Sequence, residues 1–231
     1  MLQLDHLLLT QDEFRLTADW TVDPGERIAI IGPSGAGKST LLSAIGGYFA
    51  PTSGTIRWKG RDLDGVAPGD RPVSILFQDQ NLFPHLTLAQ NLGLGLRVNL
   101  KLSQDETLRV EAALTRVGLA GFGARKPAQL SGGQVGRAAL ARALLRARPV
   151  LLLDEPFAAL GPALKAEMLA LVAEVATETG ATVLMVTHDP RDARGFADRT
   201  VLVADGVATA PMTTAGLFAD PPAALAAYLG T

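Results

Sequence analysis

A glycine-rich stretch between an apolar run and a helix-like run carries the residue types that bind phosphate. In GPSGAGKS, four residues separate Gly32 from Gly37, and Lys38 and Ser39 follow directly. Small residues leave backbone amides open to phosphate oxygens, and the N-terminus of the next helix adds positive charge. At this spacing the lysine reaches the outer phosphates and the hydroxyl binds magnesium. The stretch predicts a nucleoside triphosphate site with Mg2+, whose expected contacts are Gly32, Pro33, Ser34, Gly35, Ala36, Gly37, Lys38, Ser39 and Thr40.

Two adjacent carboxylates close a second apolar run. Asp154 and Glu155 follow Val150 to Leu153 in the segment PVLLLDEP. Ligands of parallel sheets bind beyond the carboxyl ends of the strands, so both side chains can face the crevice that holds the nucleotide. We expect Asp154 to hold the magnesium ion and Glu155 to orient or deprotonate the attacking water. Together with the glycine-rich stretch, this pair predicts hydrolysis of the triphosphate.

A second phosphate-binding segment, LSGGQ, precedes an alanine-rich helical run. Ser131 can cap that helix, and the two glycines after it leave amides bare at the positive helix end. One nucleotide needs only one phosphate-binding helix end, so a second such helix end indicates that two copies of the chain pair head to tail. ATP would then lie between the glycine-rich loop of one copy and LSGGQ of the other. An ordinary serine-glycine cap is the alternative, and the position between the other two motifs argues against it. The expected contacts are Leu130, Ser131, Gly132, Gly133 and Gln134.

Short β-like runs separated by helical stretches predict the scaffold that positions these motifs. The runs lie at 27–32, 54–60, 72–78, 149–156, 181–189 and 199–206. Nearly continuous apolar strands alternating with amphipathic helices are typical of a parallel sheet covered on both faces. The first two segments, LQLDHLLLT and FRLTADWTV, alternate more strongly and predict an antiparallel part. The predicted fold class is therefore α/β, with a mainly parallel sheet.

The strand pattern disappears between about residues 88 and 145. Within this part, Ser103 and Glu106 are spaced as a capping box and predict a helix over 103–119. We expect a single domain over 1–231, with a core made of 1–87 and 146–231 and a helical subdomain over 88–145.

Composition narrows the classes of function. The 231 residues are 48% hydrophobic, and 21 basic against 23 acidic side chains give a net charge of −2. Such a balanced chain has no field that favours nucleic acid or an anionic membrane. It has no cysteine, which excludes thiol chemistry and fits a reducing compartment. We expect no signal peptide and no membrane-spanning helix, because the apolar runs are short and interrupted by charge, so a membrane role would come through a partner.

With these motifs in this order, the chain resembles the ATP-binding subunits of ABC transporters along nearly its whole length. The resemblance implies a P-loop, RecA-like core that binds ATP and Mg2+, an integral-membrane permease as partner, and a place on the cytoplasmic face of the inner (plasma) membrane. A periplasmic or surface substrate-binding protein is implied as an indirect partner. Gln78 then contacts magnesium and the membrane subunit, and His188 contacts the outer phosphate and helps to place the water. The expected catalytic residues are Lys38, Glu155 and His188, and the expected magnesium ligands are Ser39, Gln78 and Asp154.

The chain departs from the family pattern beside two of these motifs. After EPF the family usually has serine, alanine, leucine and aspartate, where this chain has Ala158, Ala159, Leu160 and Gly161. In the family this loop crosses the dimer interface, so we expect restoring the aspartate at 161 to raise ATPase activity or cooperativity modestly. After LSGGQ, Val135 and Gly136 replace arginine and glutamine.

A third departure concerns the aromatic residue that stacks on adenine in the family. Gln11 lies near its expected place, and Phe14 is the closest aromatic residue. We interpret Phe14 as a core residue.

The transported cargo is predicted by resemblance alone. The segment from Arg71 to Leu96, with LLLDEPFAALGPALKAEML and VLVADG, looks most like the ATP-binding subunit of bacterial thiamine and thiamine pyrophosphate importers. Import of another small solute, such as a polyamine, metal ion or anion, stays open. A soluble ABC ATPase of DNA repair or translation is less favoured, because the chain has one ATPase unit, no sustained heptads and no basic patch. A P-loop kinase has no use for LSGGQ.

Overall fold

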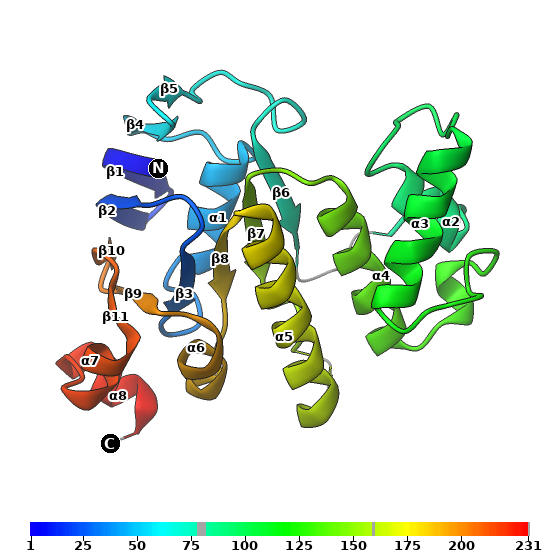
Figure 1. Cartoon of the computed structure of the whole chain (residues 1–231). Helices are drawn as coiled ribbons and strands as arrows, with labels where there is room; N and C mark the ends of the chain where they lie inside the picture. The colour runs from blue at the N-terminus through cyan, green and yellow to red at the C-terminus, as the bar shows by residue number, and fades with distance from the viewer. Residues whose placement is uncertain (78–81, 159, 231) are drawn as a thin grey trace.

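One mixed sheet with helices packed on both of its faces forms an α/β architecture (Figure 1). The computed structural model describes residues 1–77, 82–158 and 160–230. The strands are β1 (Leu2–Gln11), β2 (Phe14–Val22), β3 (Arg27–Ile31), β4 (Ser53–Trp58), β5 (Arg61–Asp62), β6 (Val73–Leu76), β7 (Val150–Asp154), β8 (Thr182–Val186), β9 (Arg199–Ala204), β10 (Val207–Ala208) and β11 (Met212–Thr213). The helices are α1 (Lys38–Gly46), α2 (Leu88–Gly93), α3 (Gln104–Arg116), the short 3-10 helix η1 (Pro127–Gln129), α4 (Gly132–Leu145), α5 (Pro162–Thr179), α6 (Pro190–Phe196), α7 (Thr214–Ala219) and α8 (Ala223–Leu229).

The centre of the sheet is parallel. The strand order is β5-β4-β1-β2-β10-β9-β3-β8-β7-β6, and the neighbours β9, β3, β8, β7 and β6 pair in parallel. Every residue of β7 and β8 is buried, because helices cover both faces of these strands. The predicted α/β class with a mainly parallel sheet is confirmed.

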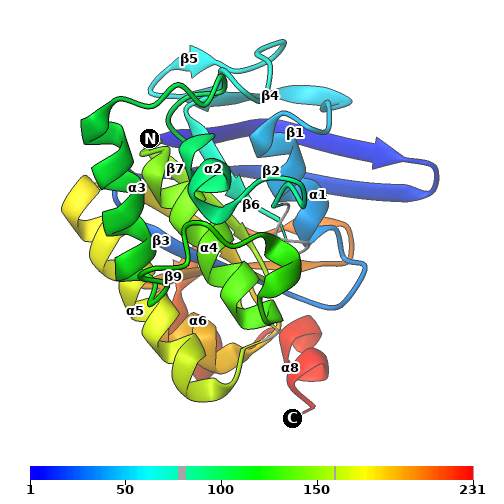
Figure 2. The same ribbon diagram turned by 90° about the vertical axis from the view of Figure 1, so that its right-hand side faces the viewer.

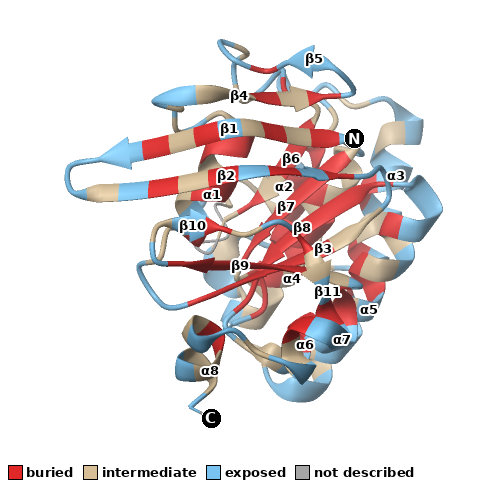
Figure 3. Cartoon of the chain, turned by 90° about the vertical axis from the view of Figure 1, so that its left-hand side faces the viewer, coloured by how far each residue is buried: buried red, intermediate tan, exposed pale blue. Residues whose placement is uncertain are grey.

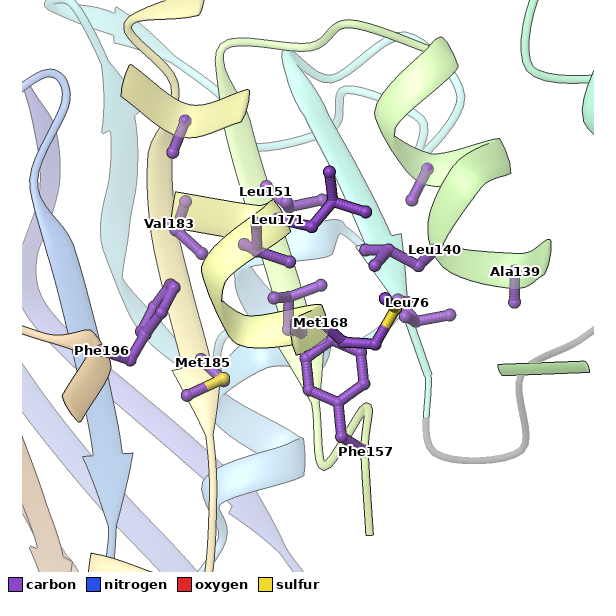
Figure 4. Close-up of a cluster of buried hydrophobic side chains, with 14 of the residues drawn as sticks. Leu76, Ala139, Leu140, Leu151, Phe157, Met168, Leu171, Val183, Met185 and Phe196 are labelled. Atoms are coloured by element: carbon purple, nitrogen blue, oxygen red, sulfur yellow. The ribbon is translucent and has the colours of Figure 1, made fainter. Parts of the chain in front are cut away.

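Alternate residues of the central strands face two separate cores. Leu152 of β7 belongs to the core that includes α1, whereas Leu151 and Leu153 belong to the core that includes α5. Figure 4 shows this second core, in which Met168 and Leu171 of α5 lie against the strands. Full burial of one such side chain contributes about 2 kcal/mol. Packing on both sides therefore fixes the strand ends from which the predicted motifs emerge.

The N-terminal part of the sheet is antiparallel, as the alternating pattern predicts. β1 pairs with β2 and with β4 in antiparallel register. Buried and less buried residues alternate along both strands of the β1–β2 hairpin (Figure 3). The apolar run at 54–60 corresponds to β4, which pairs with β1 and β5 and so lies in this antiparallel part, away from the parallel strands.

The part of the chain without strand pattern is helical. Helices α2, α3 and α4 lie together beside the β6 edge of the sheet (Figures 1 and 2). The predicted capping box is confirmed, because the Ser103 hydroxyl accepts the amide of Glu106 at 3.2 Å and the Glu106 carboxylate accepts the amide of Ser103 at 2.9 Å. None of the helices in the described ranges combines the length and the apolar character that crossing a membrane requires.

Candidate nucleotide site

The predicted phosphate and acid residues emerge from the carboxyl ends of adjacent parallel strands. Gly32 follows β3, Asp154 ends β7, and His188 follows β8, which pairs with both of them. A parallel arrangement places the three strand ends at the same edge of the sheet. This edge is where ligands of open parallel sheets bind.

Two glycines of the loop between β3 and α1 have no room for a side chain. Gly32 has φ 149, and a Cβ there would overlap the carbonyl of Val203 in β9. Gly37 has φ 100, and the ring of Phe14 occupies the place of its missing side chain. Phe14 thus packs on the loop and against the core next to α1, in agreement with its interpretation as a core residue. Glycine at these two positions lets the loop backbone pack closely and brings no side chain of its own between the loop and a phosphate.

Lys38, the first residue of α1, folds back over this loop. Its ammonium donates to the carbonyl oxygens of Gly32 at 2.8 Å and Pro33 at 2.7 Å, and the residue is only 7% exposed. Burial lowers the pKa of Lys38, and the nearby charges of Glu155 and Asp154 counteract this shift. The cation is therefore held between the loop and two carboxylates, where it can pair with the negative charge of a phosphate bound by the loop.

The hydroxyl of Ser39 joins the loop to the end of β7. It donates to the carboxylate of Asp154 at 3.0 Å. Burial raises the pKa of Asp154, an effect that the Ser39 hydrogen bond and Lys38 oppose and Glu155 reinforces. A hydroxyl next to a carboxylate is a pair of hard oxygen donors, which is the ligand type that Mg2+ prefers. The donor set thus fits the predicted ion.

Glu155 adopts a backbone conformation that L-residues rarely occupy. β7 ends at Asp154, and Glu155 has φ 45, in the left-handed region. This conformation costs about 1 kcal/mol for a residue with a side chain. It breaks the alternation of strand side chains, so both carboxylates lie near Lys38. The Glu155 carboxylate also lies 3.2 Å from Nδ1 of His188, which joins the two predicted catalytic residues.

The LSGGQ segment forms the predicted helix cap. Ser131 is the N-cap of α4, and its hydroxyl accepts the amide of Gln134, whose side chain in turn accepts the amide of Ser131. A Cβ on Gly133 would lie 2.9 Å from the side chain of Leu160, so this glycine packs on the loop after Glu155. Across the described ranges, no hydrogen bond joins Ser131 or Gln134 to the glycine-rich loop of the same chain.

The structure therefore brings Lys38, Ser39, Asp154, Glu155 and His188 together and leaves LSGGQ outside this group. Gln78 and Ala159 lie outside the described residues.

Sequence reasoning missed the side chains that hold the loop of His188. Lys165 of α5 bridges Asp189 at 3.4 Å and Asp192 at 2.6 Å, and the hydroxyl of Thr187 donates to Asp192. Asp189 also caps α6, and its bonds to Arg191 hold the pKa of its carboxyl well below the usual range. An aspartate directly before a proline is the signal that could have predicted this cap.

Comparison with known proteins identifies the family. The model of the ABC transporter family matches residues 17–158. The chain belongs to the ABC transporter family. It is similar to the thiamine import ATP-binding protein ThiQ of Cereibacter sphaeroides, with 70% identity over 230 residues and all of both chains covered. The protein of the same name from Ruegeria is 55% identical, again over the full length of both chains.

A solved ABC structure supports the fold assignment. The ATP-binding cassette MJ0796, in a dimeric post-hydrolysis structure bound to ADP and phosphate, superposes with a TM-score of 0.83 at 30% identity. The match covers 93% of this chain and 99% of the cassette. The predicted resemblance is confirmed, and the chain is an ATPase of the ABC type.

The departure at Gly161 leads to a prediction about stability. Gly161 is the N-cap of α5, with φ −65 and no side-chain cap, and no atom of the described residues lies within 4 Å of a Cβ built on it. Gly161→Asp is therefore expected to stabilise the fold by about 0.3–1 kcal/mol through capping and the helix dipole. Gly180→Asp, at the C-terminal end of the same helix with φ 65, is the matched control and should destabilise by about 1 kcal/mol. Urea unfolding measures both, and equal effects of the two variants would contradict the argument.

Proposed function

We propose that this chain is the ATP-binding and ATP-hydrolysing subunit of an importer for thiamine or thiamine pyrophosphate. The observation that carries the ATPase chemistry is the bond from Ser39 to Asp154, beside Lys38 and Glu155. The cargo is supported by full-length identity of 70% to a relative named for thiamine import. Two relatives of this name match this chain over the full length of both sequences, which supports the same role as the ATP-binding subunit of a transporter.

In the proposed site, residues 32–40 hold the phosphates. The loop amides and the ammonium of Lys38 bind the phosphate oxygens, while Ser39 and Asp154, with Gln78, would hold Mg2+. The ion supplies positive charge that offsets the phosphate charge. Glu155 accepts a hydrogen bond from the attacking water and takes up its proton, and His188, 3.2 Å away, keeps that carboxylate and the water in place.

The second half of the site comes from a second copy of the chain. The capped N-terminus of α4 at Ser131 offers amides to phosphate and has no bond to the glycine-rich loop of its own chain within the described ranges. A head-to-tail pair would place this end over the nucleotide of the partner. The dimeric state of the solved cassette MJ0796 supports such a pair.

The helical part with α2, α3 and α4 is the proposed docking subdomain for the permease. A groove of about 310 Å3 lies between β6 and these helices, lined by Tyr48, Phe77, Phe83, Arg142 and Arg146. Tyr48 is 55% and Phe83 47% exposed. Exposed apolar patches mark binding surfaces. Exposed aromatic rings beside arginines would suit a short amphipathic segment of the permease that carries acidic residues. Binding there would hold the subunit at the cytoplasmic face of the inner membrane.

The cargo assignment is tested by uptake of labelled thiamine. In cells that cannot synthesise thiamine and that lack this chain, we expect high-affinity uptake to fall to background. The wild-type gene should restore it, and Glu155→Gln should not, because the proposed transport step needs ATP turnover. Undiminished uptake after deletion, with no duplicate ATPase present, would exclude thiamine as the cargo and leave the ATPase chemistry standing.

A further inference from the structure

The C-terminal helix reaches the loop that carries His188. The hydroxyl of Tyr228 in α8 donates to the backbone carbonyl of His188 at 2.7 Å. None of the motifs that define the nucleotide site contains this tyrosine. The contact spans 40 residues of sequence and joins the last helix to the edge of the site.

The position of the hydroxyl is fixed by core packing. Leu225, one turn before Tyr228, is fully buried, and α8 begins after Pro222, whose carbonyl accepts the amide of Leu225. Tyr228 and Leu229 pack against the same core as α5 and the strands β7 and β8. The ring of Tyr228 is therefore held by burial at its base, while its hydroxyl points to the loop.

The carbonyl of His188 lies in the loop between two regular elements. β8 ends at Val186, and α6 begins at Pro190. The amides of Asp192 and Ala193, at the start of α6, donate to Asp189 and leave the preceding carbonyl to another donor. The bond from Tyr228 therefore adds a restraint from α8 to a loop that the ion pairs of Lys165 with Asp189 and Asp192 also hold.

We propose that Tyr228 is a positioning residue for ATP hydrolysis, which holds the His188 backbone so that its imidazole stays beside Glu155. This inference rests on the proposed ATPase function. The geometry is a continuous chain of contacts, from the Tyr228 hydroxyl to the His188 carbonyl at 2.7 Å and from His188 Nδ1 to the Glu155 carboxylate at 3.2 Å. The His188 side chain is 57% exposed, so packing around the ring does little to fix its orientation.

The protonation state of the tyrosine supports this role. Burial raises the pKa of Tyr228, and the negative charges of Glu155 and Asp189 raise it further. The hydroxyl therefore keeps its proton at neutral pH and remains a donor to the carbonyl.

The test compares ATP hydrolysis by the purified full-length chain and its variants. Tyr228→Phe removes only the hydroxyl, and its kcat is expected to fall about 3–10-fold, the worth of one hydrogen bond, with the KM for ATP within about twofold of wild type. Thr177→Val is the matched control, because it deletes a hydroxyl that donates to a helix carbonyl on the exposed surface of α5. It should leave kcat unchanged.

A double variant separates positioning from a general loss of stability. If Tyr228 acts through His188, adding Tyr228→Phe to His188→Ala should cause no further loss, since the group being positioned is gone. An unchanged kcat in Tyr228→Phe, or the same fold-loss in the His188→Ala background, overturns the inference. Absence of hydrolysis in the wild-type chain and its complexes would instead contradict the proposed ATPase function.

Discussion

Glu155→Gln is expected to bind ATP with nearly wild-type affinity and to hydrolyse it at least about 100-fold more slowly, the usual contribution of a general base. Glutamine has the same shape and keeps the left-handed backbone of this position, φ 45, at a similar cost. What it loses is the negative charge and the capacity to take up a proton. The charge of Glu155 contributes to raising the pKa of the neighbouring Asp154. The pKa of Asp154 should therefore fall in this variant, which favours its ionised form.

Steady-state ATPase assays and equilibrium ATP titration measure this separation of binding from turnover. The same variant should accumulate as an ATP-bridged dimer in sedimentation, because bound ATP is no longer consumed and the proposed interface persists. Glu111→Gln, which removes a carboxylate from the exposed surface of α3, is the matched control and should behave as wild type in both assays. Full turnover by Glu155→Gln assembled with its partners would remove Glu155 from the mechanism.

The motifs on regular elements were predictable from the sequence because local chemistry determines them. A serine followed three residues later by glutamate or glutamine predicts a cap, and both Ser103 and Ser131 are capping-box residues in the structure. The loop between β3 and α1 follows from its glycines, since Gly32 and Gly37 occupy positions where a side chain has no space. In these cases neighbours in the sequence are also neighbours in space.

The features that were not predicted depend on contacts between distant segments. The left-handed conformation of Glu155 is imposed by the end of β7 and its neighbour β8, to whose Val186 carbonyl the Glu155 amide donates. The bond from Tyr228 to His188 depends on where α8 packs, which no local pattern encodes. The antiparallel pairing of β4 with β1 is of the same kind, because an apolar run does not specify its partner strand.

Lys38→Ala is expected to fail at an earlier step than Glu155→Gln, namely at nucleotide binding. The variant removes the cation that faces the proposed phosphate site, and charged hydrogen bonds of this kind contribute about 1.5–3 kcal/mol, so ATP affinity should fall by roughly 10–100-fold. It also leaves the carbonyls of Gly32 and Pro33 without the ammonium donor of Lys38, a residue that is only 7% exposed. Lys101→Ala removes a cation of the same type from an exposed loop and is the matched control.

Two readouts distinguish lost phosphate binding from a damaged loop. Titration of ATP and of adenosine measures affinity with and without phosphates, and Lys38→Ala should weaken ATP while leaving the weaker adenosine binding unchanged. Thermal unfolding without nucleotide reports the cost of the unpaired carbonyls, which is independent of ATP. Equal loss of ATP and adenosine binding would show that the lysine supports the shape of the loop instead of the phosphate charge. Wild-type ATP affinity in Lys38→Ala would place the phosphates elsewhere. The Lys38 ammonium, which lies among the loop carbonyls and near the carboxylates of Asp154 and Glu155, would then have no role in binding the phosphates.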